Sequence, residues 1–151
     1  MGILEIIERD FKKALREKRV ESLSVLRILK TSLHNKEIEL RPSKQELNDE
    51  IAVEVIQREV KKRREAVEMF EKGGRSDLVE KERKELELLI KYLPEQLSDD
   101  KIRTIVSEVI KDLKTSGSPD RGRIMGQVMG RLKGRADGNR VNQIVQEELN
   151  N

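Results

Sequence analysis

The sequence predicts an all-α protein, and three observations carry that prediction. Apolar residues recur at the three- and four-residue spacing of one helix face through nearly the whole chain. No segment alternates apolar and polar residues for long enough to form a strand. Hydrophobic residues make up 35% of the chain and charged residues 40%, so its cores must be narrow stripes on helices with wide solvated faces. We expect an N-terminal helical domain with a long projecting hairpin (residues 1–94) and a small C-terminal three-helix bundle (residues 95–151).

The first two helices are predicted from their apolar stripes. The first stripe begins at the amino terminus, and the second continues to Pro42, which cannot extend a helix. Ser43 and Glu46 then have the spacing of a capping box ahead of a long third helix. The residues of the two stripes are Ile3, Ile7, Phe11 and Leu15, and then Leu26, Leu29, Leu33 and Leu40.

The third and fourth helices are predicted to form a hairpin that turns at Gly73-Gly74, with Ser76 as the cap of the fourth. The apolar stripe fails on both sides of this turn, where one helix is mainly basic (residues 61–65) and the other offers glutamates (residues 80–85). We expect solvent-exposed ion pairs between the two helices. A nucleic-acid patch is the alternative reading of the Lys-Lys-Arg-Arg run, and the ion pairs are favoured because opposed charges need no ligand.

Three shorter helices follow Pro94. Ser98 is predicted to cap the first of them, and Asp137 is predicted to cap the last. Between these two, Pro119 suits the first position of a helix capped by Ser118. Gly134 fits the left-handed residue that ends the same helix.

That middle helix lies in the stretch with the densest combination of cations and glycines, residues 119–142. On a helical wheel its apolar residues line one side, with Gly126 and Gly130 nearly opposite them. Arg123 and Lys133 flank the two glycines. A bare backbone edged by cations admits either a phosphate chain or another helix, and spacing alone favours helix packing.

The chain offers no complete active site. It has no Cys, which excludes disulfides, a thiolate nucleophile and Cys-based zinc sites. Its one His, His34, lies in the middle of a predicted helix, and its carboxylates are interleaved with Lys and Arg as in surface ion pairs. We therefore predict no catalytic residue, no metal ligand and no cofactor. An enzyme acting alone remains an alternative that would depend on His34.

Composition also bears on partners. Aromatic residues are only 2% of the chain, which weakens any function that stacks bases on rings. No apolar run approaches the roughly 20 residues of a membrane span, and the amino terminus lacks a signal-peptide pattern. We expect no membrane partner and a cytoplasmic location.

Three stretches together resemble the GatB/YqeY family. Residues 61–78, from Lys-Lys-Arg-Arg through Gly73-Gly74 to Leu78, are similar to that family's helical hairpin. Residues 92–98, Tyr-Leu-Pro-Glu-Gln-Leu-Ser, look like its linker. Met125-Gly126 with residues 132–138, Leu-Lys-Gly-Arg-Ala-Asp-Gly, resembles its carboxy-terminal signature. The resemblance covers nearly the whole chain in order.

The resemblance implies a function in RNA contact. Larger members of the family are the B subunits of the glutamine-dependent amidotransferase that converts misacylated Glu-tRNA(Gln) or Asp-tRNA(Asn), and there this helical region is a tail that contacts tRNA away from the reaction centre. By resemblance we expect a non-catalytic tRNA-binding protein, with the amidotransferase or other translation proteins as partners. The alternative is a helical protein-interaction module.

Eight residues are predicted to contact RNA. The family signature supplies four of them, Gly126, Lys133, Gly134 and Arg135. The helical wheel and the clustering of charge add the rest, Arg123, Gly130, Arg131 and Arg140.

Overall fold

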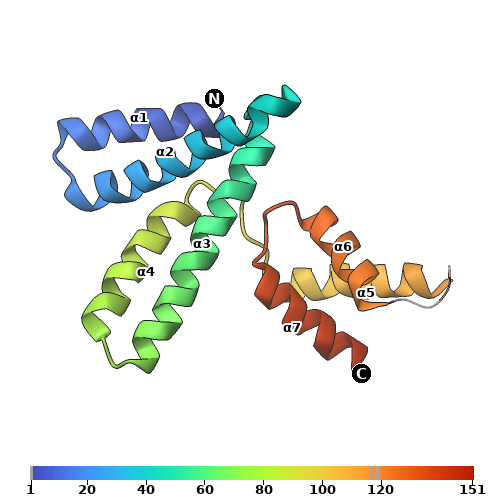
Figure 1. Cartoon of the computed structure of the whole chain (residues 1–151). Coiled ribbons are helices and arrows are strands. Elements are labelled where there is room, and N and C mark those ends of the chain that lie inside the picture. The colour runs from blue at the N-terminus through green and yellow to red at the C-terminus, as the bar shows by residue number, and fades with distance from the viewer. Residues whose placement is uncertain (1, 116, 118–119) are drawn as a thin grey trace. The chain divides into compact units, whose positions relative to one another are not determined.

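The computed structural model describes residues 2–115, 117 and 120–151, and across them the chain is all-α, as predicted (Figure 1). Seven α-helices and one short 3-10 turn are found in these ranges, and no strand. None of the helices described is long and apolar enough to cross a membrane. The chain divides into two compact units, Met1–Leu93 and Pro94–Asn151, and each is described by itself.

The first unit holds two helical hairpins around one core. The first hairpin pairs α1 (Ile3–Arg16) with α2 (Val20–Leu40), and the second pairs α3 (Asp49–Lys72) with α4 (Ser76–Ile90) (Figure 1). All four helices contribute side chains, since burying an amphipathic stripe is what stabilises such helices. The buried cluster consists of Ile7, Ala14, Val25, Leu26, Leu29, Leu33, Ala52, Val55, Ile56, Val60 and Leu89.

The start of α3 differs from the prediction, because Ser43 and Glu46 do not form a capping box. Ser43 lies in a 3-10 turn (η1, Arg41–Ser43) and its hydroxyl donates a hydrogen bond to the Leu40 carbonyl at 2.9 Å, which closes the end of α2. Asn48 caps α3 instead, with its side-chain oxygen accepting from the backbone N–H of Ile51 at 2.9 Å. The capping box fails because α3 begins only at Asp49, six residues after Ser43, so Ser43 is not at the N-cap position.

A residue of α3 also caps α1. The Asp49 carboxylate accepts a hydrogen bond from the backbone N–H of Ile3 at 3.1 Å. Gly2, the N-cap residue of α1, has no side chain that could do this. One backbone N–H of the first turn of α1 is thus satisfied by a carboxylate 46 residues away in the chain.

Ion pairs replace apolar packing over part of the α3–α4 hairpin. Arg63 of α3 bonds Glu82 at 3.2 Å and also Glu85, both on α4. The expected exposure of these pairs is wrong here, because Arg63 is only 9% exposed and Glu85 only 7%. At the far end Gly74 takes a left-handed conformation (φ 68), and Ser76 is the first residue of α4 rather than its cap.

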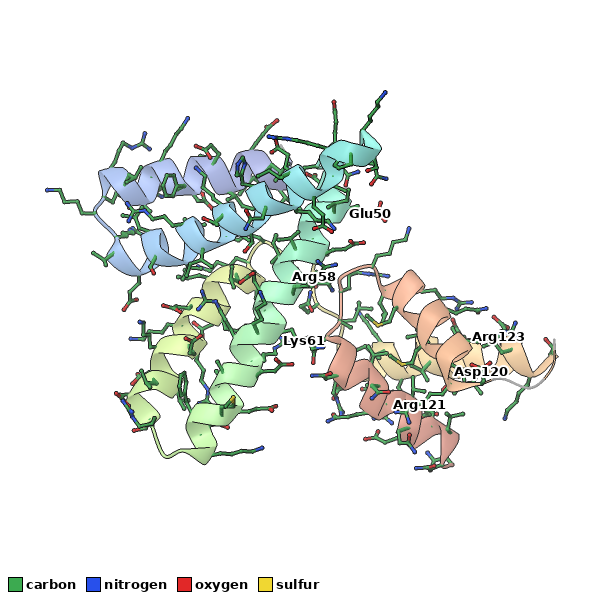
Figure 2. The ribbon with its side chains drawn as sticks, in the orientation of Figure 1. Glu50, Arg58, Lys61, Asp120, Arg121 and Arg123 are labelled. Carbon is green, nitrogen blue, oxygen red and sulfur yellow. The ribbon has the colours of Figure 1, made fainter. Side chains whose placement is uncertain are left out.

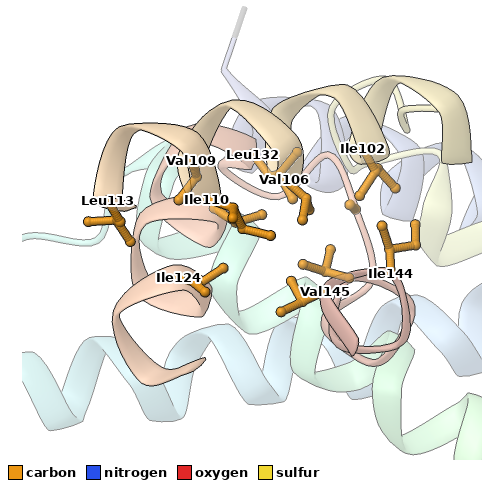
Figure 3. Packing of buried hydrophobic residues seen from close by; sticks show 12 residues of the cluster. Ile102, Val106, Val109, Ile110, Leu113, Ile124, Leu132, Ile144 and Val145 are labelled. Atoms are coloured by element: carbon orange, nitrogen blue, oxygen red, sulfur yellow. The ribbon is translucent and has the colours of Figure 1, made fainter. Parts of the chain in front are cut away.

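The second unit is a three-helix bundle of α5 (Asp99–Thr115), α6 (Arg121–Leu132) and α7 (Gly138–Leu149). Figure 3 shows buried side chains of all three helices converging on one core. Asp137 caps α7, as predicted, by accepting from the Arg140 N–H at 3.3 Å. Asp120 caps α6 by accepting from the Arg123 N–H at 2.8 Å. The cap predicted at Ser118 and Pro119 lies outside the described residues.

Hydrogen bonds fasten the segment between the two units at both ends. The Tyr92 hydroxyl donates to the Asp10 carboxylate of α1 at 2.6 Å. The Gln96 side-chain amide donates to the Gly134 carbonyl at 2.9 Å, and the backbone N–H of Leu97 donates to the Arg135 carbonyl at 2.8 Å. Residues 92 and 96 are therefore each held by the unit to which they belong.

Candidate nucleic-acid interface

The orientation of α6 is fixed by its apolar face. Ile124, Val128 and Leu132 recur every four residues and are fully buried against α5 and α7. Truncating such a side chain in a close-packed core costs about 2 to 5 kcal/mol, so this face holds the helix firmly in one rotation about its axis. What points outward from α6 follows from that rotation.

The outward face of α6 is a strip of bare backbone, which we call the glycine strip and define as Gly122, Gly126 and Gly130. All three residues are exposed. A Cβ added at Gly126 or Gly130 would have no atom within 4 Å, so packing within the chain does not explain either glycine. Sequence reasoning missed Gly122, although its spacing of four from Gly126 would have revealed it.

The glycine strip weakens its own helix. Glycine in a helix interior is about 1 kcal/mol less favourable than alanine, and Gly126 and Gly130 lie inside a helix of 12 residues. These two positions have room for an alanine side chain, whereas a Cβ at Gly122 would lie 3.3 Å from the Asp120 carboxylate. The strip is therefore costly for stability and is more easily understood as a surface for close approach.

Two of the predicted cations, one near each end of α6, have exposed side chains. Among the residues that the structure describes, neither Arg123 nor Lys133 has an ion-pair partner, and both are exposed. Arg123 lies in the first turn of α6, next to the cap at Asp120 (Figure 2). The wheel position predicted for Lys133 is wrong, because α6 ends at Leu132 and Lys133 adopts a left-handed conformation (φ 44) just beyond it.

Two further predicted cations are paired with carboxylates. Arg131 bonds Glu108 and Asp112 of α5, each at 3.2 Å. Arg140 forms a bidentate pair with Asp99, at 3.1 and 2.6 Å. Hydrogen bonding by the Arg140 guanidinium lowers the pKa of the Asp99 carboxyl below its ordinary value. Both guanidinium groups are thus engaged with surface carboxylates, and ion pairs at exposed sites are weak.

The last two predicted residues are part of the framework. The Arg135 guanidinium donates to the carbonyls of Leu132 and Arg131, at 3.0 and 2.8 Å, and so satisfies the end of α6. Gly134 is buried and left-handed (φ 83), which fits the prediction that it follows the helix end.

Sequence reasoning also missed Arg121. Its guanidinium donates to the side chains of Asn142 and Gln146 on α7 and links the start of α6 to that helix. Its neighbour Arg123 has no such bond within the described residues, and no sequence signal separates the two (Figure 2). Among the described residues, no group of three His, Cys, Asp or Glu side chains is placed to hold a metal ion.

Comparison with known proteins agrees with the order of the motifs. The model of the family described as "Yqey-like protein" matches residues 4–149. The chain belongs to the YqeY family. The three stretches that suggested this membership lie in the α3–α4 hairpin, in the segment between the units, and around the end of α6.

Several fungal proteins are similar to this YqeY chain. "Altered inheritance of mitochondria protein 41, mitochondrial" of Pyrenophora tritici-repentis is 30% identical over 148 residues, which cover 96% of this chain and 80% of the relative. An uncharacterized protein of Schizosaccharomyces pombe is 34% identical over 88 residues, 58% of this chain and 72% of the relative. The protein of Lachancea thermotolerans with the same printed name as the first is 30% identical over 112 residues, 73% of this chain and 59% of the relative.

These names correct the expected location. Two of the three relatives are named as mitochondrial proteins, so the cytoplasmic location inferred from the sequence is wrong. The inference failed because it rested on missing signals, namely a membrane span, a signal-peptide pattern and cysteines. None of these distinguishes the cytoplasm from other reducing compartments.

Proposed function

We propose that this YqeY protein binds tRNA through the glycine strip and its flanking cations, as an accessory to tRNA-dependent amidation that does no chemistry of its own. The observation that carries the proposal is the open, unpacked backbone at Gly126 and Gly130, together with an exposed Arg123 that has no ion-pair partner among the described residues. The resemblance to the tRNA-contacting tail of the amidotransferase B subunit supplies the kind of ligand.

The glycine strip allows the bound RNA to come close to the backbone of α6. Amides in the interior of a helix already donate to carbonyls four residues back, so they cannot also bind phosphate. A helix without side chains on one face instead lets a sugar-phosphate chain lie against its backbone. Arg123 and Lys133 then reach phosphates from the two ends of α6. Contacts of this kind position the RNA without reading its sequence.

A second candidate function is docking of a partner helix on the same strip. Met125 and Met129 are half-buried against the core of the second unit and flank the glycines, and methionine adapts readily to a partner surface. Small residues are also typical of close helix contacts. This function predicts a partner protein that remains bound in high salt and after nuclease treatment.

The test is a tRNA gel-shift titration at two salt concentrations. The variant Arg123→Gln with Lys133→Gln removes two charges and retains much of each side chain. We expect weaker binding and a salt slope smaller by about one unit for each lost phosphate contact. Lys111→Gln with Lys114→Gln is the matched control, because it removes the same charge from exposed positions of α5 in the same unit. Equal affinities and slopes for the two double variants would refute the proposed surface.

A further inference from the structure

A cavity of about 250 Å³ lies in the first unit, where α1 and α4 end and α2 begins. Its floor is apolar and is formed by Ala14, Leu26 and Leu88. Nothing in the proposed RNA contact uses this cavity, since that contact is assigned to the second unit.

One wall of the cavity accepts hydrogen bonds. The Tyr92 hydroxyl donates a hydrogen bond to the Asp10 carboxylate at 2.6 Å, and both residues line the cavity. Burial of the phenol, and then this bond to Asp10, raise the pKa of Tyr92, so the phenol stays protonated at neutral pH. Its only proton is committed, so the wall offers oxygen lone pairs and the carboxylate of Asp10, and Glu17 is a second carboxylate that lines the cavity. Arg9 also contacts Asp10, at 3.3 Å, from the exposed side.

The rim carries the opposite charge. Lys13 and Lys91 line the cavity, and among the described residues neither side chain has an ion-pair partner. A third rim cation, Arg19, is paired with Glu17 at 2.7 Å. The two lysines therefore leave uncommitted ammonium groups close to a carboxylate and an apolar floor.

Size restricts the ligand. The volume of about 250 Å³ corresponds to roughly eight waters at about 30 Å³ each, so a molecule of about eight to ten non-hydrogen atoms would fill it. A nucleotide, with roughly twenty or more such atoms, would extend beyond it. Inorganic phosphate would fit, but it would leave the apolar floor without a contact.

We propose that this cavity binds a free α-amino acid with an uncharged aliphatic side chain. The ammonium group contacts Asp10, the carboxylate contacts Lys13 and Lys91, and the side chain covers the floor. A zwitterion matches both charges of the site, whereas a simple anion or a simple cation matches only one.

The experiment is calorimetric titration of the full chain with leucine and with analogues that lack one charged group. We expect leucine to bind, and 4-methylpentanoate and 3-methylbutylamine to bind about tenfold more weakly or worse, because each loses a charge-assisted contact. Asp10→Asn keeps an oxygen that can accept from Tyr92. This variant should weaken the binding of leucine about tenfold and leave the affinity for 4-methylpentanoate unchanged. Lys91→Gln should weaken the binding of leucine and of 4-methylpentanoate. Lys81→Gln, at an exposed position of α4, should weaken the binding of neither.

Two results would overturn the proposal. One is the absence of binding heat with leucine, valine and isoleucine up to about 10 mM, well above the weakest affinity that such a cavity should give. The other is binding of inorganic phosphate as tight as that of leucine, since phosphate lacks both the ammonium and the aliphatic group. Neither result bears on the tRNA titration, because the residues varied here lie in the other unit.

Discussion

Replacing two exposed glycines of α6 by alanine is expected to stabilise the protein and to weaken its binding of tRNA. At Gly126 and Gly130 an added methyl group meets no atom within 4 Å, so no steric cost offsets the gain in helix propensity. The gain is about 1 kcal/mol for each site and about 2 kcal/mol for the double variant. In a unit of this size it should raise the Tm of the bundle by about 8 °C or more.

Differential scanning calorimetry of the full chain measures the gain, and the gel shift measures the loss of affinity. Gln127→Ala is the matched control, because it adds alanine at an exposed position of the same helix without touching the glycine strip. It should change the Tm by less than about 2 °C. An unchanged or lower Tm in the double variant would contradict the open environment of the strip. A higher Tm with unaltered affinity for tRNA would show that bound RNA does not approach this backbone.

Three further predictions concern polar contacts that lie within one unit or the other. Asp49→Ala removes the cap of α1 and should cost about 1 kcal/mol in urea unfolding, whereas Asp49→Asn keeps an acceptor and should cost less. Arg63→Met leaves the Glu85 carboxylate buried and unpaired and should destabilise the protein by about 3 kcal/mol or more, and Glu85→Met in the same chain should restore most of that loss in thermal unfolding. Arg140 lowers the pKa of Asp99, so this carboxylate contributes stability above its ordinary pKa of 3.8 that is lost as the pH falls through the lowered value. Arg140→Gln should therefore flatten the decline of Tm with acid below about pH 4, and an unaltered acid profile would count against the pair.

The fold class was predictable because helical periodicity is local information. The stripe of Ile124, Val128 and Leu132 is visible in the sequence and is the stripe that the second unit buries. The cap at Asp137 is equally local, since acceptor and donor lie three residues apart. Contacts between distant segments were predictable only where opposed charges flank a turn, as in the pairing of Arg63 with Glu82 and Glu85. The cap of α1 by Asp49 joins residues 46 apart, and nothing in either segment alone indicates it.

The candidate site was predictable in composition but not in the state of each residue. Periodicity gave the exposed face with Gly126 and Gly130. It could not show that Arg131 is paired while Arg123 has no carboxylate partner in the described part of the chain, because those states depend on which carboxylates α5 presents in space. Periodicity also extended the predicted helix one residue too far, to Lys133. In the structure the left-handed turn begins at that lysine and continues at Gly134.

The hydrogen bonds of Tyr92 and Gln96 leave a short stretch of chain between two held positions. Residue 92 is held by α1 and residue 96 by the turn after α6, so Leu93, Pro94 and Glu95 lie between them. The ring of Pro94 fixes one torsion of this stretch. Removing the first hydrogen bond, for example by Tyr92→Phe, should therefore increase the mobility of this stretch without unfolding either unit.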